Sequence, residues 1–206
     1  MIKRSLVVLL SIGLVSCATL DQEGCLTADW QLIGFNDGVA GRAAKRLEQH
    51  RDACAEYGVV PQIEAYLQGH DRGVIRYCTA MNGYAVARSG ASFNAVCRGD
   101  RRSAFAQGFR LGSEAYQQIE RIAEIKREIS DLQAQQREDK RLLHNQREQL
   151  MAQHLTQDQR SFLRHEIRQL EMNIRLRTVA TRQLEQIHNV EARYLMTLET
   201  DLRSQL

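Results

Sequence analysis

Residues 113–206 contain neither glycine nor proline, which restricts this part of the chain to long helices. Leu, Glu, Gln and Arg dominate the stretch, and all four are good helix formers. Apolar residues recur in it at intervals of three and four, the spacing of a coiled-coil seam. The seam positions are Ile122, Ile125, Ile129, Leu132, Leu143, Leu150, Leu163, Ile167, Leu170, Ile174, Leu184, Ile187, Leu195, Leu198 and Leu202.

The apolar pattern breaks near the middle of this stretch, where the chain is expected to turn back. Thr156 and Gln159 have the capping-box form, in which the residue that caps a helix and the residue three positions later bond reciprocally. We therefore predict an antiparallel coiled-coil hairpin over residues 113–206, with its tip near residues 154–157.

The hairpin predicts which residues lie opposite one another. Gly112 would lie near Leu198, so that the returning helix rests on the glycine face of the first helix. Polar residues interrupt the seam, and they indicate a partner contact, a device that fixes the register or a locally loose segment. The expected neighbours there are Gln136 with Ile174 and Asp139 with Glu171.

The N-terminal segment has the features of a signal peptide. Lys3 and Arg4 precede an apolar run over residues 5–15 that is too short to span a bilayer. Its end, Leu-Val-Ser-Cys, resembles the lipobox of bacterial lipoproteins, which implies removal of residues 1–16 and acylation of Cys17. In such lipoproteins an aspartate after the cysteine favours the inner membrane, whereas Ala18 here favours the outer membrane. The alternative is an ordinary secretory signal with an incidental cysteine.

The four remaining cysteines predict two disulfides. Four cysteines in an oxidising compartment allow three connectivities, and we favour the sequence neighbours, Cys25 with Cys54 and Cys78 with Cys97. A rival reading is a metal site, because His50 and Cys54 are four residues apart and would share a helix face. Structural zinc sites usually include a closely spaced cysteine pair, which this sequence lacks, so we expect neither metal nor cofactor.

Glycines recur four residues apart in the first half of the chain. The stretch AYLQGHDRGVIRY at residues 65–77 echoes AFAQGFRLGSEAY at residues 104–116, and DWQLIGFNDGVAGR is a weaker third copy. Residues four apart share one helix face, so each copy predicts a strip along which two helix backbones approach closely. The alternative is that these glycines mark turns. The glycines of the expected strips are Gly34, Gly38, Gly69, Gly73, Gly108 and Gly112.

Residues 25–110 resemble a family of small bacterial envelope lipoproteins known only as a domain of unknown function. The resemblance rests on CLTADWQLIGFNDGVAGR, HRDAC, AYLQGHDRGVIRYC and NGYAVARSGASFNAVC. It implies an envelope lipoprotein and carries no catalytic residue or ligand. The expected fold is therefore all-α, with a disulfide-stapled helical module with GxxxG helix packing over residues 17–112, followed by the hairpin.

The segment between Cys78 and Cys97 lacks a clean helical period, and we expect a disulfide-closed loop. Exposed loop residues often carry binding functions, so this loop is a candidate contact surface. The alternative is that its side chains pack onto their own domain. The candidate contact residues are Tyr84, Arg88, Ser89 and Phe93.

The sequence contains no complete catalytic motif. His165 and Glu166 begin an HExxH-like pattern, but Gln169 stands where the second histidine is needed. His70 and Asp71 are adjacent, and adjacent residues on a helix do not face each other. We therefore expect a protein that is not an enzyme.

Removal of the signal peptide takes the formal charge from +3 to +1, because Lys3 and Arg4 are lost, so we expect no nucleic-acid partner. We expect a lipoprotein that its lipid holds in the outer membrane, facing the periplasm. The hairpin is expected to be a rod that binds an envelope protein. Two chains are expected to be able to pair as a homodimer. The alternative is a module that binds a small envelope or cell-wall ligand through the 78–97 loop.

Overall fold

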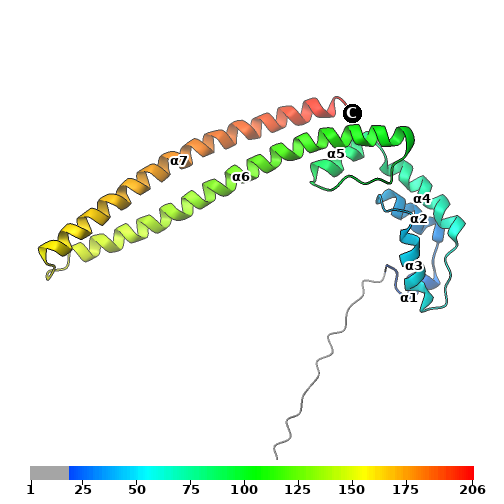
Figure 1. Cartoon of the computed structure of the whole chain (residues 1–206), viewed down its shortest axis with the longest axis horizontal. Coiled ribbons are helices and arrows are strands. Elements are labelled where there is room, and N and C mark those ends of the chain that lie inside the picture. Colours follow the sequence, from blue (N-terminus) through cyan, green and yellow to red (C-terminus); the bar gives the residue numbers. More distant parts are fainter. Residues whose placement is uncertain (1–18) are drawn as a thin grey trace, which may run out of the picture. The chain divides into compact units, whose positions relative to one another are not determined.

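The structure is a computed structural model that describes residues 19–206, and Figure 1 shows that this part of the chain is helical. The predicted all-α fold is confirmed, since the regular structure of the described residues consists of helices. In chain order the helices are α1 (Gln22–Leu26), α2 (Trp30–Val39), α3 (Arg46–Ala55), α4 (Ile63–Tyr77), α5 (Ala80–Arg88), α6 (Gly99–Leu150) and α7 (Gln157–Arg203).

The chain forms two compact units. The first contains α1 to α4 together with residues Asn94–Arg102, and the second contains Ala80–Phe93 and Ser103–Leu206. The expected end of the glycine module at residue 112 lies inside α6, which continues without interruption to Leu150. The glycine-rich helices are therefore divided between the two units.

In the first unit, α2 and α4 cross at their glycines. A methyl group on Gly34 would come closer than 3.0 Å to the carbonyl oxygen of Tyr66, and one on Gly69 would meet the carbonyl oxygen of Gln31 in the same way. Gly38 and Gly73 lie against the opposite helix backbone one turn further on. Each glycine costs about 1 kcal/mol in a helix interior relative to alanine, and the close backbone packing offsets that cost.

The second unit repeats this crossing with α5 and α6. Gly83 of α5 lies on the carbonyl oxygen of Phe105, while Gly108 and Gly112 of α6 lie on those of Ala80 and Tyr84. Two expectations are corrected here. The segment after Cys78 was expected to be a loop, but it contains a helix, and the glycine face of α6 is covered by α5 rather than by α7.

A tyrosine covers the end of each crossing. Gly41, which follows α2, has φ +69°, and the ring of Tyr77 occupies the space that a side chain there would need. Gly90, which follows α5, has φ +78° and lies in the same way against Tyr116. Glycine adopts positive φ without a steric penalty, so both helices can end in a turn that the tyrosine closes.

The two crossings match position by position. Residues of α2 correspond to residues of α5 with an offset of 49 (83 − 34), and residues of α4 correspond to residues of α6 with an offset of 39 (108 − 69). The stretch DWQLIGFNDGVAGR is thus the partner helix of the first repeat, rather than a third copy of the same helix. The partner helix of the second repeat begins the segment in which we expected a loop.

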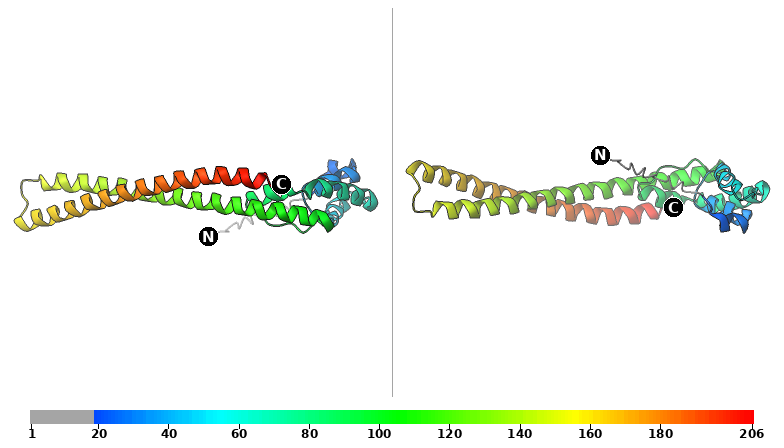
Figure 2. Two further views of the ribbon diagram at one scale, coloured as in Figure 1. Left: turned by 90° about the horizontal axis from the view of Figure 1, so that it is seen from above. Right: turned by 90° about the horizontal axis from the view of Figure 1, so that it is seen from below.

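Helices α6 and α7 form the predicted antiparallel hairpin and lie side by side in Figures 1 and 2. The turn covers residues 151–156, at the expected tip. Thr156 caps α7 as predicted, because its side chain accepts a hydrogen bond from the backbone of Gln159 and the Gln159 side chain accepts one from the backbone of Thr156.

The register of the hairpin differs from the one expected. Asp139 pairs with Arg177 rather than with Glu171, and Glu171 pairs instead with Arg147 at 2.6 Å. Gln136 likewise bonds Thr178 rather than meeting Ile174, so in this part of the hairpin the opposing residue on α7 lies further towards the C-terminus. The shift places an opposite charge next to the buried Asp139.

One seam residue was assigned to the wrong position. Ile187 is 45% exposed. Alternating steps of three and four from Leu184 lead instead to His188 and Glu191, and both are half-buried against α6. A regular heptad phase thus outweighs side-chain polarity at this turn of the helix.

The C-terminal end of α7 completes the core of the second unit. Leu202 joins Tyr84, Leu111 and Ala115 in one buried cluster, and Leu198 packs against it.

Within residues 19–206, none of the helices combines the length and apolar character needed to cross a bilayer.

Candidate functional site

A buried carboxylate lies at the centre of the first unit. Asp37 is on the face of α2 that meets α4, and only 2% of its surface is exposed. α3 brings His50 to it and α4 brings Tyr66, both of them also buried. Three helices therefore place polar side chains on one point in an interior that is otherwise packed with Cys25, Trp30 and Cys54.

The carboxylate of Asp37 is fully engaged. Its Oδ2 accepts hydrogen bonds from the His50 ring and from the Tyr66 hydroxyl, both at 2.8 Å. Its Oδ1 accepts one from Arg42 at 2.9 Å, and the Nε of Arg46 lies 3.6 Å away. A buried charge is tolerated when it is paired and hydrogen-bonded, and Asp37 has both kinds of partner.

The environment of this cluster shifts two pKa values. Burial by itself raises the pKa of Asp37, but the hydrogen bonds from His50, Arg42 and Tyr66 outweigh it and hold the pKa below its usual 3.8. The pKa of Tyr66 is raised, first by burial and then by its hydrogen bond to the Asp37 carboxylate. The cluster is therefore an ionised carboxylate with a neutral phenol at neutral pH.

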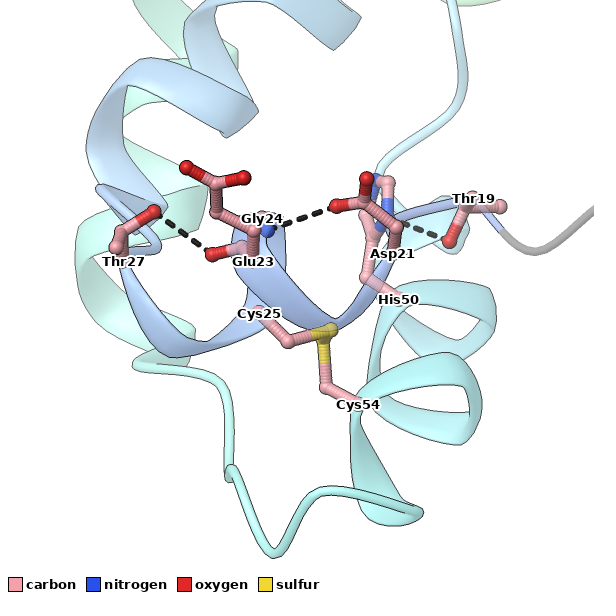
Figure 3. Close-up of a disulfide and its surroundings, with 8 residues drawn as sticks. All are labelled: Thr19, Asp21, Glu23, Gly24, Cys25, Thr27, His50 and Cys54. Atoms are coloured by element: carbon pink, nitrogen blue, oxygen red, sulfur yellow. Dashed lines mark hydrogen bonds between the residues drawn. A yellow bond between two sulfur atoms is a disulfide. The ribbon is translucent and has the colours of Figure 1, made fainter.

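The cluster reaches the start of the described chain through His50. A carboxylate can only accept, so His50 carries a proton on Nε2, and in the neutral ring Nδ1 accepts a hydrogen bond from the Thr19 hydroxyl at 2.8 Å. Figure 3 shows this bond beside the disulfide of Cys25 and Cys54. Thr19 is thus joined to the buried carboxylate through one imidazole ring.

The order carboxylate, imidazole and hydroxyl also occurs in the nucleophile relays of hydrolases. In this cluster the carboxylate serves other segments as well, because Tyr66 of α4 and Arg42, which follows α2, donate to the same group. The arrangement joins α2, α3, α4 and the chain at Thr19.

Both predicted disulfides are confirmed. Cys25 bonds with Cys54, and Cys78 bonds with Cys97, with Cα–Cα distances of 5.4 and 5.6 Å. Because its sulfur is in a disulfide, Cys54 cannot join His50 in the alternative metal site. His50 instead has Asp37 and Thr19 as its ring partners.

The candidate contact residues of the 78–97 segment have different environments. Tyr84 is 3% exposed and belongs to the core of the second unit, which corrects its assignment to a contact surface. Arg88 donates to Glu199 of α7 at 2.5 Å, and Ser89 bonds the carbonyl oxygen of Val86. Phe93 is partly exposed and packs edge-on against Phe105 and Phe109.

Sequence reasoning missed the Asp37 cluster and Gly83. His70, the histidine singled out from the sequence, bonds the carbonyl oxygen of Arg42 at 2.7 Å, while Asp71 is exposed. The place of Asp37 between Gly34 and Gly38 puts it on the crossing face. Alignment of the two partner helices would have shown that an aspartate replaces an apolar residue there.

A second feature of functional interest is an apolar stripe along the outer face of α7. Its residues are 45–61% exposed, although each is large and apolar. They follow the helical period at spacings of four, three, eight, three and four, so they lie along one face, with Gln183 between Val179 and Ile187. The members of this outer stripe are Met172, Leu176, Val179, Ile187, Val190 and Tyr194.

The outer stripe has no equivalent along α6. The exposed large apolar side chain of α6 is Leu142, at 37%. On α7, Arg168, Arg175 and Arg193 lie beside the stripe at helical spacing and are exposed. The hairpin therefore has one apolar side with basic residues along its edge.

The predicted lipid attachment residue, Cys17, lies outside the described residues. No curated protein and no solved structure gives a significant match to the chain. The family match that is found begins at the N-cap of α2 and ends in α6 just after Gly112, so it contains both glycine crossings. Residues 29–114 match the family described as a protein of unknown function, DUF2799.

Proposed function

We propose that this protein is an outer-membrane lipoprotein that faces the periplasm and uses its helical hairpin to bind an envelope protein. The anchor is supported by the sequence that ends at Cys17. The binding role is supported by the outer stripe of α7, because large apolar patches that stay exposed on a protein surface often mark interaction sites.

The partner that fits the outer stripe is a helix with an apolar face and acidic residues along one edge. The stripe is a line of side chains at helical spacing, which suits helix-to-helix packing. The arginines beside the stripe would pair with those acidic residues, which favours one orientation of the partner. The protein is proposed to act by binding, without catalysis and without a cofactor.

The anchor is tested by labelling cells with a radioactive fatty acid. The wild-type protein is expected to incorporate the label and to fractionate with the outer membrane, whereas a Cys17→Ser variant is expected to do neither. Labelling of the variant, or absence of label in the wild-type protein, would contradict the lipoprotein proposal.

The binding surface is tested by crosslinking in the cell from a photoreactive residue at position 176. Leu176 is in the outer stripe, and Ala134 is an exposed position on α6 that serves as the control. We expect a discrete adduct from position 176 and a much weaker one from position 134. Leu176→Glu together with Val190→Glu should abolish the interaction without lowering helicity, because both side chains are exposed.

A second candidate function is binding of a small envelope ligand. The first unit has a cleft of about 690 Å³ beside α4, whose lining includes both ends of the 78–97 segment. His70, Asp71, Asn94, Arg98 and Arg101 supply polar groups to its lining. A double Arg98→Ala, Arg101→Ala variant with unchanged retention on purified peptidoglycan would remove this candidate.

A further inference from the structure

The two glycine crossings provide a comparison within one chain. With the offsets given above, Asp37 of α2 corresponds to Val86 of α5, and Tyr66 of α4 corresponds to Phe105 of α6. The second crossing thus places an apolar pair where the first places a carboxylate and a phenol. Because the same backbone approach forms in both, the crossing does not require the polar pair.

The polar pair makes a connection that the apolar pair cannot make. From Tyr66 and Asp37 the hydrogen bonds continue to His50 and end at the hydroxyl of Thr19. A buried carboxylate is expensive unless every lone pair is used. Asp37 is present in only one of the two equivalent helix pairs, so we infer that this carboxylate has a role specific to the first unit.

Thr19 is two residues after the proposed acylation site, Cys17. Two residues of extended chain span at most about 7 Å. The headgroup layer on each side of a bilayer is of similar thickness, about 5–7 Å. A residue held rigidly at this point must therefore lie at the outer edge of the headgroups whenever the acyl chains of Cys17 are inserted.

We propose that Asp37, His50 and Tyr66 form a clamp on Thr19 that holds the first unit directly against the phospholipid headgroups. This inference rests on the proposed acylation of Cys17. The clamp removes the flexible linker that would otherwise separate the lipid from the folded chain. It fixes which face of the first unit meets the membrane, namely the face that carries Thr19.

The side chains near the clamp fit such a surface. Arg42 and Arg46 are both next to Asp37, and Lys45 precedes α3 beside them. Basic residues near an anionic leaflet are attracted to it. The acidic Asp21 also lies close to Thr19, but its carboxylate accepts a hydrogen bond from the backbone of Gly24 as the cap of α1 (Figure 3).

The clamp is tested by proteolysis of the full-length lipidated protein in phosphatidylcholine vesicles. Thr19→Val keeps the shape of the side chain and removes the hydroxyl. We expect release of the soluble fragment by proteinase K to become about tenfold faster, with the first cut near residue 19 located by mass spectrometry. Equal rates for the variant and the wild-type protein would overturn the proposal.

A matched control is Thr27→Val. Thr27 carries a similar hydroxyl that bonds the carbonyl oxygen of Glu23 on α1, away from His50. This variant should leave the release rate unchanged. A second clamp variant, His50→Ala, should accelerate release at least as much as Thr19→Val, provided that its far-ultraviolet circular dichroism stays that of the wild type. A folded His50→Ala protein with the wild-type rate would also overturn the proposal.

The closeness of the first unit to the membrane is tested by energy transfer. A donor at exposed position 49, next to His50, is paired with acceptor-labelled lipid headgroups. Insertion of eight Gly and Ser residues between Ala18 and Thr19 should lower the transfer, because it restores a flexible linker. Equal energy transfer with and without the insertion would contradict the proposal that the first unit is held at the lipid headgroups.

Failure of this inference can be distinguished from failure of the proposed anchor. If Cys17 incorporates no fatty acid, the lipoprotein proposal is wrong, whatever the clamp does. If Cys17 is acylated but Thr19→Val changes neither the release rate nor the cut site, the anchor stands and the clamp is wrong.

Discussion

The hydroxyl of Tyr66 donates a 2.8 Å hydrogen bond to the carboxylate of Asp37, inside a helix crossing whose second copy has Phe105 and Val86 at these positions. The chain thus contains a polar and an apolar version of the same packing arrangement. Exchanging residues between the two versions measures what each contributes.

Phe105→Tyr is expected to destabilise the second unit by about 1–3 kcal/mol. Phe105 is fully buried, and Val86 offers no acceptor to a hydroxyl, so the new polar group would be left unsatisfied. Tyr66→Phe in the first unit should cost about 1.5–3 kcal/mol, because it removes one hydrogen bond to a charged carboxylate. Urea unfolding of the two variants gives both values, and a neutral Phe105→Tyr substitution would contradict the comparison.

The stability of the first unit should fall in acid because of Asp37. Its pKa is lowered in the folded protein, so its contribution is fully present above the unfolded pKa of about 3.9 and is lost as the pH falls through the folded value. Unfolding measured by urea from pH 7 to pH 2 should show this decline, and Asp37→Asn should reduce its slope. An unchanged slope in Asp37→Asn would show that other carboxylates cause the decline.

Alanine at the crossing glycines should destabilise the helix pairs. In Gly69→Ala the added methyl group would come closer than 3.0 Å to the carbonyl oxygen of Gln31, and backbone cannot move aside cheaply. We expect a loss of about 2–3 kcal/mol despite the better helix propensity of alanine. Gln68→Ala, at an exposed neighbouring position on α4, is the control and should be close to neutral.

The pair formed by the buried Asp139 and the half-buried Arg177 should fix the register of the hairpin at some cost in stability. Asp139→Ala leaves Arg177 without its partner in the seam and should lower the melting temperature of the hairpin by several degrees. Replacing both residues with leucine should raise it, because a continuous apolar seam forms. Circular dichroism during heating gives the melting temperatures, and sedimentation reveals any change in association.

A double variant that melts below Asp139→Ala would indicate that the pair is a net source of stability. The same experiment on Gln118 and Glu191, which bond at 2.7 Å in another polar layer of the seam, gives an independent measurement. Agreement between the two layers would assign register control to polar seam residues in general.

Local sequence patterns predicted those features that depend on one helix face or on one helix cap. The hairpin and the cap formed by Thr156 and Gln159 follow from periodicity and from residues three apart. The disulfide pairing was also predicted correctly. The role of Gly83 was not predicted, because the spacing of α5 pairs Gly83 with Ala87 rather than with a second glycine, and the helix is short.

The sequence alone determined the all-α fold, the long hairpin with its turn and the glycine strips, because each depends on residues close together along the chain. Only the tertiary structure decided which helices cross, the register that sets Asp139 against Arg177, and the meeting of Asp37, His50, Tyr66 and Thr19. These features join residues far apart in the sequence. Which residues meet depends on how closely the helix backbones approach and on which buried charges find a partner. No pattern of neighbouring residues in the sequence encodes either condition.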